Sequence, residues 1–252
     1  FLFTGMSAMM AVLLPSTSVF AAIPEKEQTV YVNADGNGNT QDITVSNWLK
    51  NQDNEQTLTD KSNLSKITNV KGEETFRQNS DGTLVWDANG NDIYYQGKSQ
   101  EELPVSVKLT YYLDGKEITP EELAGKSGKL KIRIDYDNHT KEMTDIQGNQ
   151  EEICTPFMMM TAMILPTDTF TNVEITNGQV LSDGNNNIAV GLGFPGLADS
   201  LQLQDTEELK DFEIPDYAEL TADVKDFSLA MTATVATTGL LEDLNLKDIS
   251  LS

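Results

Sequence analysis

The sequence is poor in the residues that disulfide-linked folds and most catalytic sites need: it has one cysteine, one histidine and two arginines. With Cys154 alone, no intramolecular disulfide framework forms, so packing must stabilise the fold. His139 lies in the turn-like segment 137–140, and no other histidine is available to activate a serine or cysteine nucleophile. We therefore expect that the protein is not an enzyme, and that Cys154 is a half-buried strand residue.

Phosphate-binding loops and distinctive carboxylate pairs are also missing. Gly191 and Gly193 lie inside a strand pattern rather than between a strand and a helix. The chain has many acidic residues, but the sequence singles out no two of them as the acid and base of a glycoside hydrolase. A hydrolase is therefore only a third alternative.

Positive charge is scarce, with 17 lysines and arginines against 40 acidic residues and a net charge of −23. Such a chain repels phosphate backbones and anionic lipid headgroups, which argues against nucleic acids and polybasic membrane docking. Strong negative charge suits solubility in a cation-rich space outside the cell. The partner that we expect is a protein or a cell-wall component.

The first 22 residues carry no charge, and residues 1–14 are almost wholly apolar. Pro15 ends this run, three hydroxyl residues follow, and Val19-Phe20-Ala21 has the character of a cleavage site. The pattern predicts a signal peptide over residues 1–22 and an extracellular location. A retained anchor helix is the alternative, but spanning a membrane takes about 20 apolar residues and this run ends at Leu14.

The rest of the chain predicts a mainly β fold, because short alternating apolar runs are separated by turns rich in Asn, Asp and Gly. We expect an antiparallel β-sandwich, immunoglobulin-like, with short helical insertions. The segment 50–66 predicts a loop or a short helix. The predicted strands are 29–32 and 42–49 as one hairpin, 83–86 and 92–95 as another, and then 105–113, 130–136, 157–165, 172–176, 187–194 and 218–237.

Three segments of this pattern carry more detailed predictions. A one-turn helix is expected at 119–125, with Thr119 as N-cap, Pro120 in the first position and Gly125 at the end. The run 157–165 contains four methionines and predicts a buried central strand; a Cu(I) site is disfavoured because consecutive strand residues point to opposite faces. Over 218–237 the alternating apolar residues are Leu220, Ala222, Val224, Leu229, Met231, Ala233 and Val235.

The best candidate metal site is the turn that contains Asn33, Asp35 and Asn37. These oxygen-bearing residues have the 1, 3, 5 spacing of a calcium loop, and Gly38 stands at position 6. Position 12 is Thr44, so the bidentate glutamate is missing. Asn-Gly turns are also ordinary hairpin chemistry, and we expect no cofactor, with Ca²⁺ as the alternative.

The best candidate ligand surface is aromatic. Trp48, Trp86, Tyr94 and Tyr95 lie on predicted strands and together would make a platform on which sugars stack. Aromatic residues on alternating strands are more often core residues, because they bury a large apolar area.

Several short phrases of the sequence are characteristic in combination. They resemble the extracellular head of a group of uncharacterised membrane-anchored surface proteins of Gram-positive, Firmicute-type bacteria, distantly similar to the phage-infection-protein group. The resemblance covers roughly residues 28–246 and implies a β-rich head between a signal peptide and coiled-coil-like segments with a membrane span. It specifies fold and carries over no functional residue. The phrases are Val30–Val32 with Val45–Leu49, Tyr94–Gly97, Tyr111–Lys116, Leu123–Gly128, Ile164–Pro166 and Phe194–Leu197.

We expect four regions: a signal peptide at 1–22, an N-terminal β-rich region at 23–103, a β-sandwich domain at 104–238 and the start of a helical or linker segment at 239–252. A single continuous β-structure is the alternative. The function that we expect is interaction, adhesion or structural support by a non-catalytic domain at the cell surface, anchored through sequence beyond this chain. The second hypothesis is a secreted carbohydrate-binding or Ca²⁺-dependent binding module.

Overall fold

The computed structural model describes residues 8–13, 24–146, 149–201, 213–228 and 231–238. Most of the predicted signal peptide and the segment 239–252 lie outside these residues. Of the first 22 residues only Ala8–Leu13 is described, as strand β1, and the signal peptide stays a prediction. In the described part of the chain, no helix is long and apolar enough to cross a membrane.

The chain forms two compact units. Unit 1 comprises residues 1–10, 33–41 and 103–252, and unit 2 comprises residues 11–32 and 42–102. The turn 33–41 belongs to unit 1 because it packs on strand β9 (Val105–Leu113): the Leu109 N–H donates to the Asn37 carbonyl at 2.8 Å. Gly38 lies so close to this strand that an added Cβ would be 2.1 Å from the Val107 carbonyl oxygen.

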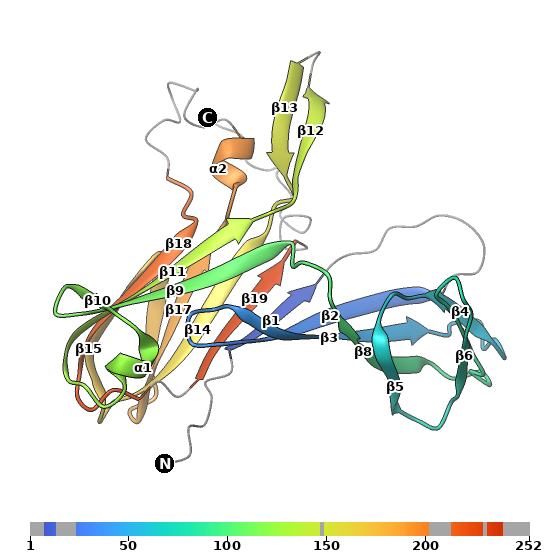
Figure 1. The fold of residues 1–252 in the computed structure, drawn as a ribbon, viewed down its shortest axis with the longest axis horizontal. Coiled ribbons are helices and arrows are strands. Elements are labelled where there is room, and N and C mark those ends of the chain that lie inside the picture. Colours follow the sequence, from blue (N-terminus) through green and yellow to red (C-terminus); the bar gives the residue numbers. More distant parts are fainter. Residues whose placement is uncertain (1–7, 14–23, 147–148, 202–212, 229–230, 239–252) are drawn as a thin grey trace. The chain divides into compact units, whose positions relative to one another are not determined.

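Unit 2 combines four neighbouring strands with a separate three-stranded sheet (Figure 1). The prediction of a loop or a short helix over 50–66 holds for 51–57 and 62–64, which are irregular, but it missed β4 and the start of β5. The predicted hairpin of 83–86 with 92–95 is wrong, because the two strands belong to different sheets that share one core. The four neighbouring strands have the order β2 (Glu25–Ala34), β3 (Thr40–Lys50), β8 (Ile93–Ser99), β5 (Ser65–Lys71). The three-stranded sheet has the order β4 (Leu58–Lys61), β7 (Thr83–Trp86), β6 (Phe76–Gln78).

Unit 1 contains two packed sheets, and the predicted class, a mainly antiparallel β-sandwich with short helices, is confirmed (Figure 1). The expected helix is α1 (Pro120–Leu123), where the Glu122 N–H donates to Thr119 Oγ1 at 3.3 Å. A hairpin of β12 (Lys141–Ile146) and β13 (Asn149–Cys154) and a second one-turn helix, α2 (Leu197–Ser200), complete the unit. One sheet has the order β10 (Lys116–Ile118), β9, β11 (Gly128–Asn138), β18 (Tyr217–Val224), β15 (Phe170–Thr176); the other contains β16 (Gly178–Ser182), β17 (Asn186–Gly193), β14 (Met158–Pro166), β19 (Met231–Thr237).

The two sheets of unit 1 approach closely at the glycines of β17. A Cβ on Gly193 would lie 2.4 Å from the Tyr136 ring, and one on Gly191 would lie 2.5 Å from the Ala218 Cβ. These glycines therefore serve sheet packing, since no side chain fits between the layers there. The core between the sheets includes Leu109, Tyr111, Ile132, Ile134, Met159, Met163, Leu165, Phe170, Leu220 and Phe227.

The run 218–237 divides into two strands that use the alternation differently. In β18, the predicted apolar residues Leu220, Ala222 and Val224 are buried, as expected. In β19 the buried residues are Thr232, Thr234 and Ala236 instead. The apolar residues predicted for this strand, Met231, Ala233 and Val235, lie on the other face.

Candidate functional site

The four predicted stacking aromatics do not form one platform. Trp86 and Tyr95 are fully buried in unit 2, with their ring centroids 5.3 Å apart. Phe76 adds a third ring, 4.6 Å from Trp86, and the Tyr95 hydroxyl donates to Asp60. Burial raises the pKa of Tyr95 far above its ordinary value, and the neighbouring Asp60 carboxylate adds to the shift. This pair is core, so it cannot contact a ligand.

Trp48 and Tyr94 form the exposed half of the set. They are register partners on β3 and β8, and their rings stack with centroids 5.5 Å apart at an interplanar angle of 16°. Both side chains are half-buried. Lys50 Nζ lies 4.8 Å from the Trp48 centroid, and Lys71 Nζ lies 4.2 Å from the Tyr94 centroid. Because the space between the rings is too narrow for an ammonium group, the lysines cover their outer faces.

Asp92 fixes the orientation of Trp48. Its Oδ2 accepts from Trp48 Nε1 at 2.9 Å, and its Oδ1 accepts from the Asn51 N–H at 2.7 Å. The bond from Asn51 is the main cause that holds the pKa of Asp92 below 3.8; the Trp48 bond adds to it, and burial opposes it. A sugar could stack on this pair only by displacing a lysine.

The candidate calcium turn is organised by Asp35 itself. Asp35 Oδ1 accepts from the N–H groups of Asn37 and Asn39 at 2.9 and 3.0 Å, and Oδ2 accepts from Asn39 Nδ2 at 2.9 Å. Partial burial tends to raise the pKa of Asp35, but these bonds outweigh it and the pKa lies below 3.8. In the described residues, no three His, Cys, Asp or Glu side chains converge as metal ligands. The structure thus gives Asp35 a role in the turn that needs no metal.

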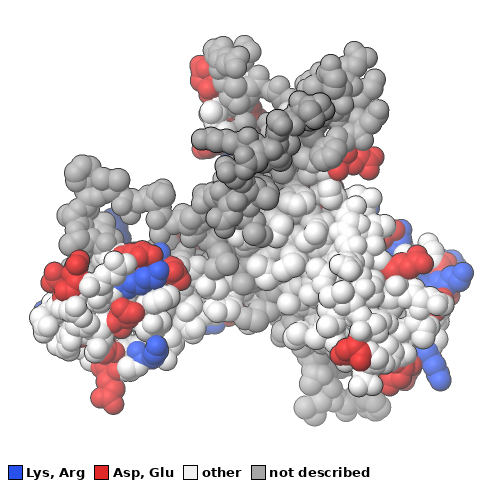
Figure 2. All heavy atoms as spheres, turned by 180° about the vertical axis from the view of Figure 1, so that it is seen from behind, with Lys and Arg blue, Asp and Glu red and all other residues white. Residues whose placement is uncertain are grey.

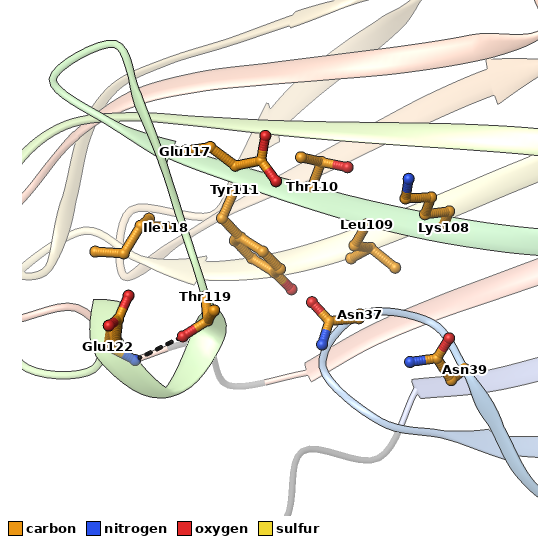
Figure 3. Close-up of a pocket in the computed structure, with 10 residues that line it drawn as sticks. All are labelled: Asn37, Asn39, Lys108, Leu109, Thr110, Tyr111, Glu117, Ile118, Thr119 and Glu122. Carbon is orange, nitrogen blue, oxygen red and sulfur yellow. Dashed lines mark hydrogen bonds between the residues drawn. The ribbon is translucent and has the colours of Figure 1, made fainter.

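A pocket of about 460 Å³ opens beside this turn (Figure 3). The turn forms one wall, and β9, β10 and the start of α1 form the others. The Tyr111 hydroxyl donates to the Gly36 carbonyl at 2.7 Å at its base. Lys108, Glu117 and Glu122 line it, each without an ion pair to a described residue. The pocket is open to solvent and is lined by both polar and apolar groups, so it could hold a small charged ligand.

The single cysteine and the single histidine have separate surroundings. Cys154 ends β13 half-buried, as predicted, and its sulfur packs against Gly196. His139 follows β11, and its Nε2 bonds to Ser106 Oγ at 3.0 Å. His139 Nδ1 also lies 3.8 Å from Asp137 Oδ2, so the imidazole stands between a serine hydroxyl and a carboxylate. No hydrogen bond between described residues joins it to Cys154.

The feature that stands out in unit 1 is the outer side of β16, β17, β14 and β19, which we call the apolar face. Strand register places its residues in rows across the sheet, such as Leu192, Met160 and Val235. Leu181 and Met231 are both 51% exposed, and Met160 is 37% exposed. The face consists of Leu181, Ile188, Val190, Leu192, Met158, Met160, Ala162, Ile164, Met231, Ala233 and Val235.

No charged residue lies among the outward positions of these four strands, and the polar ones, Gln179, Asn186 and Thr237, lie toward the margin. Figure 2 looks at unit 1 from this side and shows a broad uncharged surface, with charged side chains toward its edges. Four strands at about 4.8 Å spacing and seven residues at about 3.4 Å give roughly 450 Å². This lies within the range of about 300–600 Å² for the largest apolar patch of a typical monomer, and such a patch is often functional.

The opposite outer face of the same sandwich has the usual polar character. Lys131 forms an ion pair with Glu219 at 3.3 Å, and its ammonium also lies 4.6 Å from the Tyr112 ring centroid. Arg133 pairs with Asp135 at 2.7 Å and covers the Tyr217 ring at 4.0 Å. One sheet therefore meets solvent with charges, and the other does not.

The prediction of a buried central strand over 157–165 is only half right. Strand β14 is central, between β17 and β19, and its inner residues Met159, Met163 and Leu165 are fully buried. Its outer residues belong to the apolar face. Antiparallel strands with one solvated face normally alternate between apolar and polar residues. The outward positions Met158, Met160, Ala162 and Ile164 are all apolar, so β14 lacks the polar alternation of a strand with one face in water.

Comparisons with known proteins give no family: no family profile and no curated protein matches the chain. Among solved structures, the chain is similar to the Fcho1 Mu homology domain of Danio rerio with a bound Eps15 peptide. The identity is 7%, the match covers 92% of this chain and 95% of that chain, and the TM-score is 0.36. A likeness at this level carries no argument about function.

Proposed function

We propose that the chain is a non-catalytic interaction module of a bacterial envelope protein, working outside the cytoplasmic membrane, and that the apolar face is its contact surface. The uncharged segment 1–22 and the resemblance to Gram-positive surface proteins support the location. The face supports the mode of action, because a flat apolar sheet gains free energy when another surface removes it from water.

The reversed alternation of β19 carries this proposal. Thr232 and Thr234 are 3% and 5% exposed, while Met231 on the other side is 51% exposed. A strand with one face in water would turn the threonines out and the apolar residues in. The sequence of β19 instead fits a strand that is covered on both sides, one by the β11 sheet and the other by a partner.

Binding to envelope fractions tests the proposal. The labelled 252-residue protein is incubated with detergent-solubilised envelope proteins and, separately, with peptidoglycan sacculi from a Gram-positive bacterium. We expect saturable binding to the proteins, lost in Ala162→Glu and kept in Thr221→Glu, a matched change on the charged face. Binding that is equal in the two variants, or absent in the unmodified protein, would contradict the proposal.

Glycan binding is the second candidate, and the half-exposed Trp48–Tyr94 pair is the observation that favours it. The lysines over both rings count against it, since they occupy the surfaces that a sugar would use. Binding to sacculi that is abolished by Tyr94→Ala and unaffected by Ala162→Glu would establish it. Tyr112→Ala is the control, because Tyr112 is also half-buried beneath a lysine, in unit 1.

A further inference from the structure

We propose that the apolar face is the interface of a symmetric homodimer, packed against the same face of a second copy. This inference rests on the proposed function, because it names the partner of the same surface. A two-fold interface needs a surface that complements itself. A flat, uncharged sheet meets this need, and sheets stack face to face at about 10 Å with their side chains interdigitated.

The rows of the face provide the relief for such packing. Val190, Ala162 and Ala233 form a middle row of smaller side chains. Larger side chains flank it on both sides: one row has Leu192, Met160 and Val235, and the other has Ile188, Ile164 and Met231. A second copy displaced by one row would place Met160 over the Ala162 of its partner, so that long side chains fill the trough of the small ones.

Desolvation selects an apolar partner. A polar surface that docked here would lose its hydrogen bonds to water and find no donor or acceptor among the side chains of the face. Among the outer sheet faces described above, only the apolar face itself has the required character. The side of unit 1 formed by β9, β11 and β18 is charged, and the Trp48 side of unit 2 carries lysines and carboxylates.

Charge permits this arrangement despite the net charge of −23. In a face-to-face dimer the charged sheets of the two sandwiches point away from each other. With three layer spacings of about 10 Å, they lie roughly 30 Å apart. The Debye length at physiological salt is about 8 Å, so their repulsion is largely screened.

The area indicates a weak interface. Two faces of roughly 450 Å² bury about 900 Å² together, below the standard interface of 1,200–2,000 Å². We therefore expect a reversible, concentration-dependent dimer.

Sedimentation equilibrium of the 252-residue protein between about 1 and 200 μM tests the inference. We expect a concentration-dependent dimer that Ala162→Glu weakens at least tenfold and Thr221→Glu leaves unchanged. A cross-linking experiment tests the same interface without placing a charge on the apolar face. In a Cys154→Ser background, Ala162→Cys should give a disulfide-linked dimer on mild oxidation, and Thr221→Cys should not.

A protein that is monomeric at 200 μM, or a dimer that survives Ala162→Glu and fails to cross-link through Ala162→Cys, would overturn the inference. The envelope-binding experiment separates this failure from failure of the proposed function. A monomer whose apolar face still captures an envelope protein keeps the proposed function and rejects the homodimer. Loss of both rejects both.

Discussion

The hydroxyls of Thr161 and Thr234 lie 2.7 Å apart in the core of unit 1, on neighbouring strands of the sheet that carries the apolar face. The Tyr136 hydroxyl, from the opposite sheet, donates to Thr161 Oγ1 at 2.8 Å. Burial raises the pKa of Tyr136 to about 12, so this hydroxyl is a neutral donor at all physiological pH values. Thr161 thus satisfies a tyrosine hydroxyl that is buried away from water, and Thr234 bonds to Thr161.

Removing the central hydroxyl should cost more than removing a terminal one. Thr161→Val leaves both Tyr136 and Thr234 without their partner, and we expect a loss of about 2 kcal/mol in the free energy of unfolding. Thr234→Val should cost about 1 kcal/mol. In the variant that combines Thr161→Val and Thr234→Val, the Tyr136 hydroxyl is left without a partner. Adding Tyr136→Phe should restore part of the lost unfolding free energy, because no unpaired donor remains. Urea unfolding of the unmodified protein and the four variants measures these differences, and equal effects of the two single variants would contradict this hierarchy.

Strands β18 and β19 show how much of the fold could be predicted from the sequence. Alternation predicted one strand over 218–237, whereas the structure has two strands in different sheets, and it identified the buried side only in β18. In β19 the apolar residues Met231, Ala233 and Val235 pointed to the wrong face. The choice of face depends on contacts with Tyr136 of another sheet, 95 or more residues earlier in the chain, and local alternation does not contain this information.

The candidate site was only partly predictable for the same reason. Trp48, Trp86, Tyr94 and Tyr95 are equivalent as residue types, but strand parity separates them: Tyr94 and Tyr95 are adjacent and must face opposite sides. The sequence could predict that one of these two sides is core. It could not predict that lysines from β3 and β5 cover the exposed rings, because this depends on the pairing of β5 with β8.

Gly193 is predicted to be intolerant of a side chain. In Gly193→Ala the new Cβ would lie within 2.4 Å of the Tyr136 ring, so the sheets must separate or the ring must move. We expect a loss of about 2–3 kcal/mol in unfolding free energy by overpacking. Gly184→Ala is the control: nothing lies within 4 Å of its Cβ, and only its positive φ of 93° imposes a cost, about 1 kcal/mol. Comparable melting temperatures for the two variants would show that the layers are looser than described.

Asp92 is expected to contribute a pH-dependent part of the stability of unit 2. Its folded pKa lies below 3.8, so the unfolded chain binds its proton more readily. The contribution is therefore complete at pH values above about 4 and is lost as the pH falls through the folded pKa. Urea unfolding at pH 7 and pH 3 should show a smaller difference for Asp92→Asn than for the unmodified protein. Trp48→Phe removes one donor and should have an intermediate effect; an unchanged pH dependence in both variants would contradict the role of the carboxylate.

The turn at Asp35 is expected to be stable without calcium. Both carboxylate oxygens already accept hydrogen bonds from the turn, and a cation would have to compete with them. We expect 1 mM Ca²⁺ to leave the melting temperature unchanged. Asp35→Ala should lower the unfolding free energy by about 1 kcal/mol, with no rescue by Ca²⁺.

Asp183→Ala is the matched control, because Asp183 Oδ1 accepts from the Asn185 and Asn186 N–H groups in the same way. Ligand binding raises stability by RT ln(1 + [L]/Kd), so a site of 10 μM affinity would add about 2.7 kcal/mol at this concentration. A rise of that size in the unmodified protein and in Asp183→Ala, but not in Asp35→Ala, would establish the calcium site instead.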